Sequence, residues 1–321
     1  MMVKLSWTAA NLRWRSALLF LVGVSALLLS ACTPRQPYVP ESSQIPFGQG
    51  RLWKVEGDGI ETSYLFATLD FFDERIHELP PEAETAFGKA EVLALEQIED
   101  PYILRDLYKE ENLEMSGDRT LHDLIGARTY GTLSWHMKRN LRKPNDKIKP
   151  WVLWAYLGGE HFGFFDYDYE VDTRSDKSQA DWLEDRAVTD GKKPIALQTE
   201  QEVFDIYDKM PLEHQAAMLQ ERADRLGEMS PGPQMMQFYL DGDLARLKAL
   251  WLEYLSWLPP ATAEVLDARR ITDRNLVMVE RLLPLMKEQP VFTAVDHLHL
   301  TGEKGMLRLL EQRGFSVVSL R

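Results

Sequence analysis

The chain has 321 residues, of which 45% are hydrophobic and 27% are charged, and its formal net charge is −13. A chain of this length and composition can bury a sizeable core and form one large domain or two small ones. Because the chain is acidic and carries no block of Lys or Arg, the sequence argues against nucleic acid as a partner, since phosphate binding needs a basic surface.

The N-terminal segment predicts a lipoprotein signal peptide. Three basic residues, Lys4, Arg13 and Arg15, precede an apolar run over residues 17–29 that is too short to be a comfortable membrane span. The run ends in Leu-Ser-Ala-Cys, and this pattern resembles a bacterial lipobox whose cysteine, Cys32, becomes lipidated. The alternative is an uncleaved anchor helix. Cys32 is the only cysteine, so no disulfide forms within the chain.

Removal of the predicted signal peptide, residues 1–31, would take away three basic residues and change the net charge from −13 to −16. Residues 32–50 are rich in proline and predict a tether. The sequence thus predicts an acidic domain, residues 51–321, held in the bacterial cell envelope by the lipid on Cys32. Thr33 after the cysteine favours the outer membrane, with the domain facing the periplasm.

Runs typical of strands alternate with runs typical of helices along residues 51–321. This alternation predicts an α/β fold with a central sheet and a large helical insertion. Residues 64–70 and 292–299 are both predicted strands that end in polar side chains, which gives the chain a rough internal symmetry. The predicted strands are residues 51–57, 62–70, 91–99, 194–199, 291–295 and 315–320. The predicted helices are residues 80–90, most of 101–170, the two runs that flank the strand 194–199 within residues 178–210, and residues 212–230, 238–258, 272–287 and 304–314.

Seven short motifs occur in a fixed order, and the order is more specific than any one of them. They are LWKVEG at 52–57, ATLD at 67–70, LALE at 93–96, LQT at 197–199, GDL at 242–244, RN at 274–275 and DHLHLTG at 296–302. In this order the chain resembles the TraB/GumN family, which includes the Tiki proteins. The family is distantly similar to the erythromycin-esterase-like and ChaN-like proteins.

The resemblance implies an α/β fold with two related halves and a metal-dependent hydrolase or peptidase site. On the matching positions, the metal ligands would be Asp70, Glu96 and His299, and catalysis would use Glu96, His299 and Arg274. Imidazole and carboxylate ligands hold a divalent metal, which lowers the pKa of a bound water toward neutrality. The expected cofactor is therefore a divalent ion: Mn²⁺, Mg²⁺, Ca²⁺ or Zn²⁺.

Three further residues are candidates for binding the substrate, a peptide or small molecule. They are Gln198, Asn275 and His297. An Arg-Asn pair such as Arg274 and Asn275 is suited to holding a carboxylate or a developing oxyanion.

The chain departs from the family pattern at several positions. Asp70 stands where the family has His, Gln198 where it has Glu, and Asp296 and Leu298 where it has Gly. One interpretation is that the metal site is altered and inactive, and the fold now serves a binding or structural lipoprotein. The other is an active hydrolase with a carboxylate-richer ligand set, which would favour Mn²⁺, Mg²⁺ or Ca²⁺ over Zn²⁺. Two of the four key side chains, those at positions 70 and 198, differ from the family pattern. This loss favours the interpretation that the site is altered and inactive.

Overall fold

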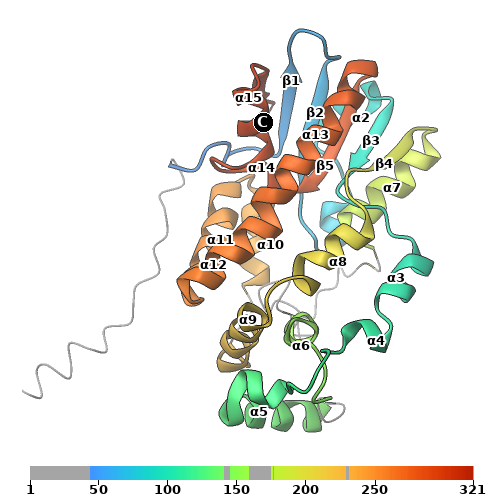
Figure 1. The fold of residues 1–321 in the computed structure, drawn as a ribbon. Helices are drawn as coiled ribbons and strands as arrows, with labels where there is room; N and C mark the ends of the chain where they lie inside the picture. The colour runs from blue at the N-terminus through green and yellow to red at the C-terminus, as the bar shows by residue number, and fades with distance from the viewer. Residues whose placement is uncertain (1–43, 141–144, 159–174, 176, 229–230, 321) are drawn as a thin grey trace, which may run out of the picture. The chain divides into compact units, whose positions relative to one another are not determined.

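The computed structural model of the chain describes residues 44–140, 145–158, 175, 177–228 and 231–320 (Figure 1). Cys32, the predicted signal peptide and most of the predicted tether lie outside the described residues. Within the described ranges, no helix combines the length and the apolar character needed to cross a membrane.

A six-stranded sheet forms the centre of the fold, as predicted, and each strand coincides with one of the predicted runs. Its order is β4-β3-β5-β2-β1-β6. The first four strands in this order are parallel, whereas β1 is antiparallel to both of its neighbours. The strands are β1 (Leu52–Glu56), β2 (Ser63–Thr68), β3 (Val92–Leu95), β4 (Lys193–Ala196), β5 (Val291–Asp296) and β6 (Ser316–Ser319).

The three central parallel strands are almost continuously apolar because helices cover both faces of the sheet. On one face lie α10 (Gly232–Leu240), α13 (Asp273–Glu288) and α15 (Met306–Gln312). On the other lie α2 (Pro81–Lys89) and α7 (Gln179–Thr189). Because both faces are covered, one edge remains for polar chemistry: the carboxyl ends of the strands.

A helical insertion between β3 and β5 has its own core, centred on Trp151, Trp154 and Trp251, which are each buried. The aromatic run that contains Trp151 and Trp154 therefore belongs to a core. The helices of this insertion are α5 (Leu121–Asn140), α6 (Pro150–Tyr156), α8 (Glu200–Asp208), α9 (Leu212–Asp224), α11 (Leu244–Trp257) and α12 (Pro260–Asp267). Two short helices without a buried residue, α3 (Pro101–Leu107) and α4 (Glu110–Leu113), precede them.

The last part of the predicted tether, residues 44–50, packs onto the domain. The N–H of Gly302 donates to the carbonyl of Pro46 at 2.9 Å, and the N–H of Ala245 donates to the carbonyl of Gly48 at 2.8 Å. A side chain at Gly48 would meet the Cβ of Ala245 at 2.6 Å, so this contact requires glycine. The folded part therefore begins before residue 51, because backbone groups of the domain are satisfied by this segment.

Strands β2 and β5, which the sequence pairs as corresponding elements, lie side by side and parallel, with Thr68 opposite Asp296. The chain turns at once from β5 into a short helix, α14 (His297–Leu300). The polar ends of β2 and β5 thus meet at one edge of the sheet. The relationship between two halves of the sheet stays a prediction.

Candidate functional site

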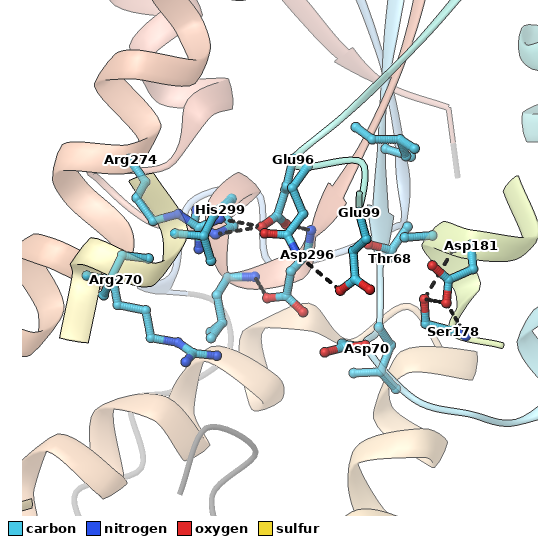
Figure 2. A pocket seen from close by; sticks show the side chains of 18 of the residues that line it. Thr68, Asp70, Glu96, Glu99, Ser178, Asp181, Arg270, Arg274, Asp296 and His299 are labelled. Carbon is cyan, nitrogen blue, oxygen red and sulfur yellow. Dashed lines mark hydrogen bonds and ion pairs between the residues drawn. The ribbon is translucent and has the colours of Figure 1, made fainter. Parts of the chain in front are cut away.

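A cavity of about 640 Å³ opens at the carboxyl ends of the parallel strands (Figure 2). Residues that follow β2, β3 and β5 line it, together with residues of α7, α8 and the start of α13. Open α/β sheets bind ligands at this edge, where the connections diverge. The sequence predicted a site in this place.

Glu96, the first residue after β3, lies at the centre of a network of charges and hydrogen bonds. Arg274 Nη2 donates to Glu96 Oε2 at 2.8 Å, and the backbone N–H of Asp296 donates to Oε1. The Nε of Arg274 donates to Gln198 Oε1 at 2.7 Å. Three predicted site residues from distant parts of the sequence, Glu96, Gln198 and Arg274, are therefore in direct contact, as Figure 2 shows for Glu96 and Arg274.

The surroundings of Glu96 stabilise its ionised form. Burial favours the neutral acid and opposes this effect, but the charges of His299 and Arg274 and the hydrogen bond from Asp296 outweigh burial and lower the pKa of Glu96 well below its ordinary value. Glu96 is therefore a carboxylate at neutral pH, and Arg274 balances its charge.

Asn275 fixes the orientation of His299. The amide Nδ2 of Asn275 donates to the carbonyl of Lys304 at 2.7 Å, so Oδ1 is the atom that faces His299 Nδ1, at 2.6 Å. The hydrogen of the neutral ring therefore lies on Nδ1, and Nε2 carries a lone pair. Nε2 lies 3.4 Å from Glu96 Oε2. Two acceptors at this distance need a proton or another cation between them.

The pKa of His299 is lowered, chiefly because burial disfavours the imidazolium, while the carboxylate of Glu96 partly opposes this effect. His299 is 2% exposed and Asn275 is fully buried. Asn275 lies behind His299 rather than among the described residues that line the cavity, and it acts on the ring instead of on a ligand.

Asp296 and His297 form a second pair at the edge of the cavity. Asp296 Oδ1 accepts the N–H of Leu298 at 2.9 Å and so caps α14, while Oδ2 lies 3.1 Å from His297 Nδ1. Although burial opposes it, the pKa of Asp296 is lowered, mainly by His297. Both residues line the cavity. This pair has no counterpart in the family pattern, in which glycine stands at the position of Asp296.

A π-helical turn, Ala268–Thr272 (labelled η4), brings two arginines to the site. The turn joins α12 to α13 without a break, and the side chain of Thr272 makes no capping hydrogen bond. Arg269 points back to the carbonyls of α8, and Arg270 lines the cavity, where it donates to the hydroxyl of Tyr207. Single π-helical turns are rare and are frequent at functional sites.

Asp70 lines the same cavity but lies apart from Glu96 and His299, on the connection that leaves β2 (Figure 2). Across the described part of the chain, no three His, Cys, Asp or Glu side chains are grouped so that they could hold a metal ion. The predicted set of Asp70, Glu96 and His299 therefore does not fit a divalent ion in this arrangement, and the metal stays a prediction.

The sequence interpretation missed residues that the structure places at the cavity: Arg270, Asp296, Glu99, Asp181 and Glu184. Two signals were present. Arg270 and Arg274 are four positions apart and so share one helix face. Asp296 directly precedes a helical run, which is typical of a capping residue. The remaining acids lie in segments that are far apart in the sequence, and only the fold brings them together.

Comparison with known families decides the classification. The model of the TraB/PrgY/gumN family matches residues 51–319. The chain belongs to the TraB/PrgY/gumN family. Comparisons with curated proteins and with solved structures give no match. The match confirms the family that the ordered motifs indicate, and the domain of this TraB/PrgY/gumN protein contains the whole sheet and the cavity.

Proposed function

We propose that this TraB/PrgY/gumN protein is a lipid-anchored protein of the bacterial cell envelope whose cavity binds a small molecule or peptide, and whose site no longer supports metal-dependent hydrolysis. One observation carries the proposal: the Glu96 carboxylate is already bound by the guanidinium of Arg274 and the N–H of Asp296. To bind a metal ion, the Glu96 carboxylate would have to give up its contacts with Arg274 and Asp296.

The charges of the central groups support the same conclusion. Glu96 and Arg274 are oppositely charged, and His299 adds a neutral imidazole. These three side chains together therefore carry no net negative charge that would attract a divalent cation. Hard divalent ions are held by several oxygen ligands, among them at least one or two carboxylates. Asp70, the third predicted metal ligand, lies on the separate connection that follows β2.

The alternative is an active divalent-metal hydrolase. The contact between His299 Nε2 and Glu96 Oε2, at 3.4 Å, favours it, since both atoms have lone pairs that an ion would satisfy. In such a site Asn275 would orient His299, and the ion would lower the pKa of a bound water.

Calorimetric titration of the full-length protein in detergent with Zn²⁺ and Mn²⁺ separates the two functions. We expect no saturable binding by the native protein, and the same result for Glu96→Ala and His299→Ala. Glu110→Ala, on the exposed helix α4, is the control for loss of a carboxylate. Binding by the native and control proteins that disappears in both site variants would contradict the proposal and establish the hydrolase-type metal site.

The lipid anchor has a separate test. Cys32→Ser should accumulate as an unprocessed precursor that incorporates no labelled palmitate, because no other cysteine exists in the chain. Normal processing of this variant would rule out a lipoprotein.

A further inference from the structure

The cavity carries far more negative than positive charge. Four acidic residues line it and make no ion pair with Lys or Arg anywhere in the described structure: Glu99, Asp181, Glu184 and Glu200. The hydrogen bonds of Asp181 and Glu200 are to uncharged groups, the capping residue Ser178 and the N–H of Asp100. Figure 2 shows Glu99 and Asp181 on one flank of the cavity and Arg270 and Arg274 on the other. Among the residues that the structure describes, the acidic flank therefore has no Lys or Arg partner.

The pKa values of two of these acids reflect this crowding. Burial raises the pKa of Glu99, and the charges of Asp181 and Glu200 raise it further. Burial likewise raises the pKa of Glu184, with Asp181 and Asp185 adding to the effect. A positive group placed between these side chains would relieve the repulsion.

An independent observation also points to a ligand with hydrogen-bond donors. His297 lines the cavity and is 2% exposed, and its Nδ1 is held by Asp296. Its Nε2 is buried and has no hydrogen-bond partner among the described residues. His297 Nδ1 faces the carboxylate of Asp296, so the ring hydrogen lies there and Nε2 can act as an acceptor without a donor. Buried polar atoms are rarely left in this state, so a donor from a ligand is the natural partner.

The remaining wall of the cavity is aromatic. Trp151, Phe204 and Tyr108 contact one another edge to face, with ring centroids 5.3–6.3 Å apart, and Tyr207 stacks on Trp151. All four line the cavity. At the rim, Phe72 is 42% exposed. Aromatic faces bind both apolar groups and organic cations, the latter more strongly where water is excluded.

We propose that the cavity binds an organic cation: a primary ammonium or guanidinium group, with N–H donors, carried on an apolar body. The acidic flank holds the positive charge, His297 Nε2 accepts one N–H, and the aromatic wall covers the apolar body. This inference rests on the proposed ligand-binding function and specifies the class of ligand. Arg270 and Arg274 keep the charged group on the opposite flank.

Three probes of nearly equal size test the inference by calorimetry on the full-length protein in detergent. They are 2-phenylethylamine, 2-phenylethanol and 3-phenylpropionate, which are cationic, neutral and anionic. We expect the amine to bind about tenfold or more tightly than the alcohol, with an affinity that falls as salt is added, and the carboxylate not to bind. Equal binding of amine and alcohol, or preference for the carboxylate, would overturn the inference.

Variants of the cavity assign the effect to its residues. The double substitution Glu99→Gln/Glu184→Gln should weaken amine binding about tenfold and leave alcohol binding unchanged. The matched control is Glu110→Gln/Glu111→Gln on α4, outside the residues that line the cavity. His297→Phe keeps a ring of similar shape and should also weaken the amine. If His297→Phe does not fold, the glutamine variants alone decide the outcome.

Failure of this inference differs from failure of the proposed function. If 3-phenylpropionate binds instead of the amine, the cavity remains a binding site and only the ligand class is wrong. If the native protein binds Mn²⁺ or Zn²⁺ through Glu96 and His299, the proposed function is wrong. The titration with the amine then decides separately whether the cavity selects cations. Amine binding that the control substitution reduces as much as the cavity substitution would overturn the assignment to the acidic flank.

Discussion

The amide of Asn275 makes two hydrogen bonds that together fix the ring of His299. One goes to the carbonyl of Lys304 and the other involves His299 Nδ1. The site therefore has a defined acceptor, His299 Nε2, beside Glu96. In the sequence, Asn275 is only the second letter of an Arg-Asn motif, and its role follows from burial that the sequence does not reveal.

Asn275→Ala should destabilise the protein by about 1–3 kcal/mol, because it leaves the buried Nδ1 of His299 and the carbonyl of Lys304 without this partner. Urea denaturation measures the change, and nitrogen NMR of His299 should show loss of the single Nδ1–H tautomer. Asn112→Ala is the matched control, since its amide also donates to backbone carbonyls but is exposed. Equal losses in both variants would mean that burial of Asn275 does not matter.

Within the described residues, Arg274 is the only Lys or Arg side chain that forms a salt bridge with Glu96. Arg274→Leu should cost about 3 kcal/mol, because it leaves a largely buried carboxylate without its cation. Glu96→Gln/Arg274→Leu should recover most of this loss. The control is Arg128→Leu, whose pair with Asp224 is exposed and should contribute less than about 1 kcal/mol. A double variant no more stable than Arg274→Leu would argue against the pairing.

The lowered pKa of Glu96 has a consequence for stability against pH. Its ionised form contributes stability above the ordinary carboxyl pKa, and this contribution is lost as the pH falls from about 4.5 toward the lower pKa of the folded protein. Glu96→Gln should therefore flatten the loss of stability on the acid side. Denaturant titrations between pH 7 and about pH 3 measure it, with Glu111→Gln as control. Parallel curves for native protein and Glu96→Gln would contradict the lowered pKa.

At the scale of the element, the loop between α14 and α15 depends on one glycine. A Cβ on Gly305 would lie 2.2 Å from the carbonyl oxygen of Leu300, and a backbone atom cannot move aside easily. This loop follows His299 directly and includes Lys304, whose carbonyl binds Asn275. The glycine thus supports the geometry of the site from behind.

Gly305→Ala should destabilise the protein by more than about 2 kcal/mol and disturb the resonances of His299. Gly88→Ala, in helix α2, is the control: a Cβ there meets nothing within 4 Å, so this substitution should stabilise by about 0.5–1 kcal/mol. Thermal unfolding of both variants gives the comparison. A neutral Gly305→Ala would show that the loop relaxes at little cost.

The central strands were the most predictable elements because their apolar runs are bounded by turn residues and are buried on both faces. The π-helical turn Ala268–Thr272 was not predictable, since no residue in it signals an inserted position. For the site, motif order placed Glu96, Arg274 and His299 together correctly. Asp70 was placed less well, because it lies two residues beyond β2 on a connection that stands apart from Glu96 and His299 (Figure 2).

At the scale of the whole molecule, the segment before β1 belongs to the fold. A protein that begins at residue 51 should unfold at a lower temperature than one that begins at residue 44, because it loses the hydrogen bonds from Gly302 and Ala245 to this segment. Thermal unfolding of the two forms tests this expectation. Indistinguishable transitions would place the end of the tether at residue 50 after all.

This docked segment sets how far the cavity can travel from the bilayer. On the proposed anchoring, only residues 33–43 of the tether would separate the lipid from the domain. They span at most about 40 Å when fully extended. The segment that follows this part of the tether contacts the domain at Gly302, in the loop after α14. If the chain is anchored in this way, the cavity would stay within a thin layer next to the membrane, where a ligand held at the surface would reach an effective concentration on the order of millimolar.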